Sequence, residues 1–417
     1  MKMENASLWL RLKSESSIGD SSRAKRPYVV FWVTCLLMLL LTVGPTLAED
    51  SPKNEAKQSD ANAQEEERET GVLELSVGDN WIFSPVILPI VSPDKGAGLA
   101  LGGMATFSTE PENKELPRST MVLAVIPSSN SALGIAANIE SFWLDDRLRS
   151  GIEADFDTGP SNYWPVGYEA GREIDKDEDV TEYDRDVVDI PLVAGWRLSP
   201  SIFGGIKFHV LDMKVNERSP TQEEDPNFQE YGDDITNIGA GVRFLYDTRD
   251  DTLNAYAGRF LGFDVTFYRE WLGSDQEFEV YSVDYRQYHQ IKRPGRTIAW
   301  QLYGRVANGE VPWVSKSSVG SSNDLRGYTY GRFRDDAAVW ALVEYRHMTN
   351  TKLWKIGRNG FAAWGGIGFI GEDLGDLGGH ELPNAGVGYR LELQDRRNLR
   401  LDVGVGYDEV GVYLNFA

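Results

Sequence analysis

The sequence predicts an all-β fold, a transmembrane antiparallel β-barrel of about 16 strands in a bacterial outer membrane. Three observations support this prediction: an N-terminal segment ordered like a secretory signal, no later apolar run of helix-spanning length, and alternating apolar and polar residues that repeat to the end of the chain. Successive side chains of a strand lie on opposite faces, so only alternate residues of a barrel strand meet lipid.

Residues 1–48 have the features of a cleaved signal peptide. Basic side chains within 23–26 precede the apolar stretch 28–43, and small residues for cleavage follow at 46–48. An uncleaved membrane anchor is the alternative, but the apolar stretch is shorter than the ~20 residues that a spanning helix needs. Cys35, the only cysteine, lies in this segment, so cleavage leaves a mature chain without thiols or disulfides.

Residues 49–71 are expected to form a disordered acidic leader, because they lack aromatic residues and cannot bury enough apolar surface to offset the entropy of ordering. Residues 72–417 are expected to form the barrel. No segment between the leader and the first predicted strand is long enough for a separate periplasmic domain. The formal net charge of -22 argues against nucleic acid as a partner, since phosphates are bound by Lys and Arg.

Alternation is clearest near the C-terminus, where Leu401 and Val403 interleave with Arg400, Asp402 and Gly404. A soluble β-sandwich would show the same pattern. Three features favour the barrel: the polar face carries full charges and glycines, aromatic residues (11%) gather toward segment ends, and no helical period appears. In lipid an open sheet edge leaves backbone groups unpaired, so such a sheet has to close.

The alternating segments give the predicted strands, an even number as bacterial barrels require. They are 82–91, 97–108, 121–127, 131–142, 148–157, 186–198, 202–215, 236–247, 258–271, 278–291, 296–306, 337–348, 360–370, 383–393, 398–407 and 411–416. Short connections such as 144–146 and 292–295 suit the periplasmic side. The long connections expected outside the cell are 159–184, 216–234, 308–336 and 371–382.

The connection 308–336 contains the motif Leu325, Arg326, Gly327 and Tyr328, and a strand with the order Glu-Tyr-Arg follows it. This resembles the sixth extracellular loop of the BamA/TamA-like outer-membrane superfamily, also called the bacterial surface antigen family, whose motif lies between strands eleven and twelve. The predicted strands place it there as well. The resemblance implies a barrel whose sixth extracellular loop is folded into the lumen.

Three other stretches agree with this resemblance. The segment 246–258 is similar to the family's periplasmic turn between strands eight and nine, and 163–168 is similar to an aromatic-glycine element of its third outer loop. The chain ends like the terminal strand signal that the assembly machinery reads, apart from one additional residue. The residues that carry this similarity are Gly411, Tyr413, Leu414 and Phe416.

An arginine inside a barrel needs an acidic partner, because an unpaired charge away from bulk water is costly. In the family, an acidic residue of strand thirteen receives this arginine, but the corresponding stretch here, 364–366, contains no acid. We therefore predict that Arg326 pairs with Glu344 on strand twelve, which should point inward together with Arg346. The alternative is that Arg326 is a solvated arginine of a surface loop.

The resemblance implies an integral outer-membrane protein related to insertases and translocases, and a member that lacks the periplasmic POTRA repeats. Such a protein would assist the insertion or transport of protein or lipid. The route that the resemblance implies is a seam between the strands 82–91 and 411–416. The expected partners are outer-membrane lipids, the machinery that inserts the barrel itself, and a polypeptide or lipid client. No cofactor or metal is expected. A passive porin-like channel or surface antigen without an assembly role is the alternative.

The sequence does not favour an enzyme. The four histidines, His209, His289, His347 and His380, are scattered without metal-ligand spacing. No activated-serine signature is present either.

Overall fold

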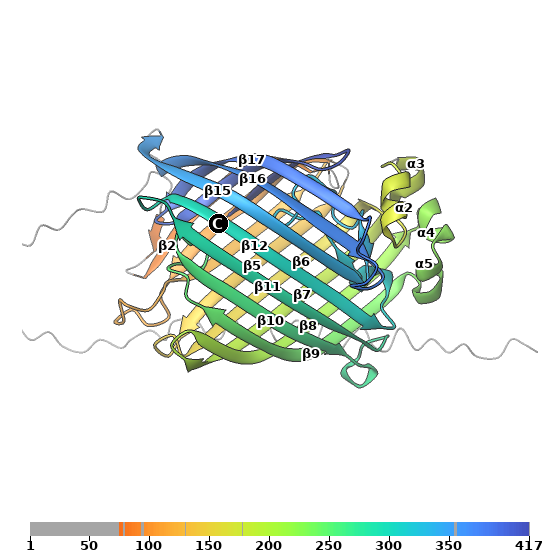
Figure 1. The fold of residues 1–417 in the computed structure, drawn as a ribbon, viewed down its shortest axis with the longest axis horizontal. Coiled ribbons are helices and arrows are strands. Elements are labelled where there is room, and N and C mark those ends of the chain that lie inside the picture. The colour runs from red at the N-terminus through yellow and green to blue at the C-terminus, as the bar shows by residue number, and fades with distance from the viewer. Residues whose placement is uncertain are drawn as a thin grey trace, which may run out of the picture. The chain divides into compact units, whose positions relative to one another are not determined.

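A sheet of 17 antiparallel strands dominates the computed structural model and curves into a barrel (Figure 1). The structure describes residues 75–77, 80–92, 96–129, 131–176, 178–353 and 357–416, which belong to the unit Arg68–Ala417. The predicted signal peptide and acidic leader, 1–48 and 49–71, lie outside the described residues.

Sixteen of these strands form the barrel wall, and each corresponds to one strand predicted from the alternation. In chain order they are β2 (Trp81–Ser92), β3 (Gly96–Phe107), β4 (Ser119–Pro127), β5 (Leu133–Trp143), β6 (Leu148–Asn162), β7 (Glu182–Ser199), β8 (Ile202–Glu217), β9 (Asp234–Asp247), β10 (Gly258–Tyr268), β11 (Phe278–Gln290), β12 (Arg296–Gly309), β15 (Ala337–Leu353), β16 (Gly357–Gly371), β17 (Glu381–Gln394), β18 (Arg397–Val405) and β19 (Val410–Phe416).

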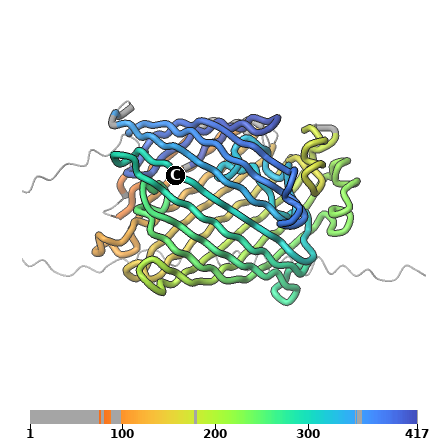
Figure 2. The backbone as a smooth tube through the Cα atoms, in the orientation of Figure 1, coloured from red at the N-terminus to blue at the C-terminus, as the bar shows by residue number. Residues whose placement is uncertain are grey.

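Each wall strand pairs antiparallel with the next along the chain, and β19 adjoins β2, which returns the wall to its first strand. The strands cross the wall obliquely (Figure 2), as closure of a barrel requires. A three-residue strand, β1 (Leu75–Val77), pairs with the start of β2. The sequence did not predict β1, because three residues are too few to show alternation.

The alternation has the physical cause that was predicted. Apolar side chains such as Val343, 53% exposed, cover the outward face, whereas their neighbours Glu344 and Asp402 are buried on the inward face. The register of β15 with β16 keeps Val343 beside Gly365 and Glu344 beside Trp364. A slip of one residue would exchange the two faces, so lipid outside and charge inside fix the register together.

The connections differ at the two ends of the barrel. One end, here called the loop end, carries the long connections, and the other, the turn end, carries mostly short ones. Helices α2–α5 gather at the loop end in Figure 1. They are α2 (Tyr168–Glu173), α3 (Glu178–Thr181), α4 (Pro220–Glu224) and α5 (Pro226–Tyr231).

These helices were not expected, since the sequence shows no helical period. They span four to six residues, which is too short for a period to appear. Local capping fixes them instead: Ser219 and Gln222 form a capping box at the start of α4. No helix in the described part of the chain is long and apolar enough to cross a membrane.

A charge placed on the outward face tests the orientation of the wall. Val343→Arg, near the middle of β15, should cost about 2–4 kcal/mol of folding stability, because the guanidinium would meet hydrocarbon. The matched variant Thr351→Arg, toward the turn end of the same strand, should cost about 0–1 kcal/mol. Unfolding by denaturant in lipid vesicles measures both, and equal costs would contradict a lipid-facing Val343.

Candidate functional site

The connection between β12 and β15 is the candidate functional site, and we call residues 310–336 the motif loop. It contains a short 3-10 helix, η2 (Trp313–Ser315), and a two-stranded sheet of β13 (Ser317–Ser318) and β14 (Arg334–Asp335). Its apolar side chains Leu325, Tyr328 and Phe333 are buried in one cluster with Trp340 and Trp364 of the wall. The loop is therefore packed against inward-facing side chains of β15 and β16.

Arg326 of the motif loop is buried, with 3% of its surface exposed. Its Nη2 donates to Glu344 Oε2 at 2.7 Å, and its Nη1 donates to Asp402 Oδ2 at 2.7 Å. The guanidinium carbon lies 3.5 Å from the centroid of the Trp364 ring, in a cation–π contact. The structure thus brings Arg326 and Glu344 together, and it adds Asp402, which the sequence analysis did not identify as a partner.

Three further arginines surround the same two carboxylates. Arg346 Nε donates to Glu344 Oε1 at 2.6 Å, and Arg400 Nη2 donates to Asp402 Oδ2 at 2.8 Å. Arg390 donates through Nη1 to Asp402. Arg326, Arg346, Arg390, Arg400, Glu344 and Asp402 form what we call the Arg326 cluster. It joins the motif loop to β15, β17 and β18.

Glycines of the wall make room for the backbone of the motif. A Cβ on Gly404 would lie 2.1 Å from the carbonyl oxygen of Arg326, and a Cβ on Gly368 would lie 2.3 Å from Leu325 Cδ1. Gly327 itself has a φ of +126°, and a Cβ there would lie 2.6 Å from the backbone nitrogen of Gly406. The sequence analysis interpreted glycines on the polar face as typical of a barrel interior. In the structure, glycines of this kind leave the space that the backbone of the motif loop occupies.

The motif loop also contacts the last strand. Gly327 donates its backbone N–H to Tyr413 Oη at 2.9 Å, and Tyr413 Oη donates to the carbonyl of Tyr328 at 3.1 Å. Asn415 Nδ2 donates to Ser322 Oγ at 3.0 Å. Two strands back along the wall, Tyr328 Oη donates to Pro383 O at 2.6 Å.

The residues predicted as a terminal assembly signal all lie on β19. Gly411 leaves space for the ring of Tyr413, while Leu414 pairs with Leu401 and Phe416 with Leu399 of β18. Tyr413 bonds to the motif loop through its side chain. Recognition of this strand by an assembly machinery stays a prediction.

A second arginine fixes the motif loop nearer the loop end. Arg332 Nη2 donates to Asp408 Oδ2 at 2.7 Å, a second nitrogen binds Glu409, and Nε donates to the carbonyl of Gly171 at 2.7 Å. Burial works against the charge of Arg332, but the carboxylates of Asp408 and Glu409 outweigh it and raise its pKa. Burial likewise raises the pKa of Tyr328, so its hydroxyl stays a neutral donor.

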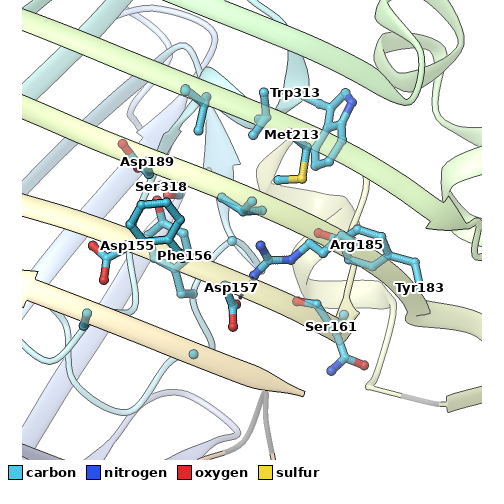
Figure 3. A pocket seen from close by; sticks show the side chains of 18 of the residues that line it. Asp155, Phe156, Asp157, Ser161, Tyr183, Arg185, Asp189, Met213, Trp313 and Ser318 are labelled. Carbon is cyan, nitrogen blue, oxygen red and sulfur yellow. Dashed lines mark hydrogen bonds and ion pairs between the residues drawn. The ribbon is translucent and has the colours of Figure 1, made fainter. Parts of the chain in front are cut away.

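On the side of the barrel opposite the Arg326 cluster, the motif loop leaves part of the wall uncovered. A cavity of about 390 Å³ lies between β5–β8 and the motif loop. Figure 3 shows Asp155 and Asp157 on one strand with Arg185 reaching toward Asp157, which its Nη2 binds at 2.9 Å. A second cavity, of about 450 Å³, lies farther along the wall. It shares Thr252 and Leu253 in its lining with a third, of about 340 Å³, which borders Arg326 and Glu344 of the Arg326 cluster. Polar space therefore runs beside the motif loop.

The seat of the loop backbone can be tested with two glycine variants. Gly404→Ala should displace the motif loop, because its methyl group would meet backbone atoms of Arg326 that cannot move independently. Gly365→Ala is the matched control, since a Cβ there has its nearest neighbour at 3.8 Å. Limited proteolysis within residues 310–336 measures the displacement. Equal cleavage of both variants would contradict the claim that Gly404 makes room for the loop backbone.

The carboxylates can be tested by isosteric neutralisation. Glu344→Gln or Asp402→Asn should each loosen the motif loop at a cost of about 3–5 kcal/mol, because a buried guanidinium loses one charged partner. Glu279→Gln is the control, since its partly exposed pair with Arg269 should contribute only about 0–1 kcal/mol. Protease resistance and heat-modifiable electrophoretic mobility report the change. Wild-type behaviour of both cluster variants would contradict the role of the pairs.

Comparison with known proteins places these features in a family. Residues 132–406 match the Omp85 superfamily domain, whereas no curated protein sequence matches the chain. The structure of CdiB from Escherichia coli is similar to this chain, with a TM-score of 0.52 and 13% identity, over 80% of this chain and 67% of that one. At this identity the similarity concerns the fold.

Two further solved structures match with lower scores. BamA from Haemophilus ducreyi, lacking POTRA domains 1–3, gives a TM-score of 0.48 and 13% identity over 78% of this chain and 67% of that one. CdiB from Acinetobacter baumannii gives 0.49 and 12% over 79% of this chain, which spans 57% of that protein. The resemblance stated from the sequence is confirmed at the level of the family: the chain belongs to the Omp85 superfamily and is a β-barrel of the bacterial outer membrane.

Proposed function

We propose that this barrel assists the insertion or translocation of client polypeptides at the outer membrane, with the motif loop folded into the lumen as a plug that also holds the last strand. The family relationship supports a role in transport or assembly. One observation carries the finer proposal: the motif loop binds β15, β17 and β18 through the Arg326 cluster and binds β19 through Tyr413 and Asn415.

The last strand depends on such support because its own pairing is short. Only seven residue pairs join β19 to β18, whereas β15 and β16 share fourteen. Each ladder contributes main-chain hydrogen bonds in proportion to its length. The contacts from Gly327 and Ser322 therefore make up a larger part of what holds β19 than they would for any longer strand. A change in the motif loop would be transmitted directly to the seam between β19 and β2.

The lining of the barrel also suits this function. The motif loop covers part of the β15–β19 side, while cavities of about 390 and 450 Å³ remain beside β5–β9 and one of about 340 Å³ reaches the Arg326 cluster. Those cavities are lined by charged and polar groups, including Asp155, Lys207 and Arg243. Such a lining solvates a hydrophilic segment of a client, and displacement of the motif loop would widen the space further.

Reconstitution tests the proposal. Liposomes containing the full-length mature protein should insert an unfolded outer-membrane β-barrel client faster than protein-free liposomes. Arg326→Ala should bring the rate close to that of protein-free liposomes, because β19 loses its support from the loop. Arg218→Ala is the control, since Arg218 forms an exposed ion pair with Asp233.

The outcome separates this function from a passive channel. If the wild-type protein does not accelerate client insertion, the proposal is wrong. Steady, ion-selective conductance that survives deletion of residues 310–336 would then favour a channel that has no assembly role.

A further inference from the structure

A small internal cavity of about 10 Å³ lies between the Arg326 cluster and the turn end. Asn254 and Tyr256, from the connection between β9 and β10, line it on one side. The wall residues opposite them are Glu344, Arg346, Arg390, Asn398 and Arg400. The small cavity adjoins the cavity of about 340 Å³, with which it shares Glu344, Arg346 and Arg400 in its lining, and it has room for one small occupant only.

The connection 248–257 reaches this position by crossing the mouth of the barrel. Asp250 binds Nη2 of Arg396, in the turn between β17 and β18, at 3.0 Å, and Asp251 binds Nη1 of Arg397, the first residue of β18, at 2.8 Å. These ion pairs join segments about 146 residues apart in sequence. They hold Asn254 beneath the Arg326 cluster.

Several buried polar atoms around this cavity have no hydrogen-bond partner among the described residues. They are Asn254 Nδ2, Arg390 Nη2, Asn398 Oδ1 and Arg400 Nε. Three of the four are donors, and Arg390 is 3% exposed. Native proteins leave few buried polar groups unsatisfied, so four around one small cavity indicate an occupant that accepts hydrogen bonds.

The charges of the cluster indicate the sign of that occupant. Four guanidinium groups, those of Arg326, Arg346, Arg390 and Arg400, share the two carboxylates of Glu344 and Asp402. Two positive charges of the cluster are thus without a matching carboxylate within it. Uncompensated buried charge is strongly destabilising, and a neutral water would satisfy the donors without compensating the charge.

We propose that this cavity binds one small inorganic monovalent anion, with chloride as its physiological form. Arg390 Nη2, Arg400 Nε and Asn254 Nδ2 donate to it in charge-assisted hydrogen bonds. The small volume excludes phosphate and organic carboxylates. Because Asn254 belongs to the crossing connection, the anion links that connection to the Arg326 cluster and stabilises the turn end of the barrel.

Anion exchange at constant ionic strength tests the site on the purified full-length mature protein. The unfolding midpoint should be higher in sodium chloride than in sodium gluconate, whose anion is too large for the cavity. At a chloride concentration 100 times the dissociation constant, the equilibrium constant for unfolding should fall about 100-fold. An identical midpoint in the two salts would overturn the proposal.

An isosteric variant provides the specific control. Asn254→Asp places a carboxylate where the anion is proposed to bind, so its unfolding midpoint should no longer depend on chloride. The backbone contacts of residue 254 with Asp251 and Arg396 are unaffected by this change. Asn308→Asp, at an exposed position of the loop end, should keep the full chloride dependence. Equal chloride dependence in both variants would contradict the assigned position.

Bromide gives a direct measurement that does not depend on a variant folding. Crystals of the wild-type protein grown in bromide should show an anomalous peak between Arg390, Arg400 and Asn254. Density without anomalous signal would identify an ordered water and overturn the proposal. The site requires no client, so this result stands apart from the insertion assay.

Discussion

The buried charge of Arg326 is the constraint on which the arrangement depends. Its guanidinium lies on the inner wall, where Glu344 and Asp402 each bind it at 2.7 Å and the Trp364 ring covers it. The two carboxylates belong to β15 and β18, so they converge only when the intervening wall is curved and in register. Buried ion pairs add little net stability but are costly to break. The ion pairs of Arg326 therefore determine where the motif loop lies against the inner wall more than they add to its net stability.

The side chains of the wall suit a loop that lies against its inner face. Small inward residues such as Gly404 and Gly368 admit the loop backbone, while outward residues at alternate positions remain apolar for lipid. The docked loop then supports the short last strand through Tyr413. This contact joins the motif loop to β19, the strand that adjoins β2. The Arg326 cluster and the crossing connection 248–257 meet at one small cavity, which extends the same charge network to the turn end.

Local patterns of the sequence predicted most of the fold, because alternation is a property of each strand alone. The same alternation predicted that Glu344 points inward, where it meets Arg326. Asp402 was missed although it lies on the polar face of its strand, since a contact across 76 residues depends on wall curvature and register. The crossing of 248–257 was missed because the length of a turn does not reveal where it folds. The short helices and β1 carry too few residues to give a pattern.

The docking of the motif loop on the last strand in an intact outer membrane is the central claim. Ser322→Cys with Asn415→Cys, in a chain also carrying Cys35→Ser, replaces two side chains that are joined by a hydrogen bond, from Asn415 Nδ2 to Ser322 Oγ at 3.0 Å. Mild oxidation of cells should form an intramolecular disulfide, and Arg326→Ala should abolish it. The contrary result concerns the double cysteine variant that keeps Arg326. If its thiols stay free after oxidation, and a membrane-impermeant maleimide labels the thiol at position 322 from outside the cell, the loop is not docked on the last strand.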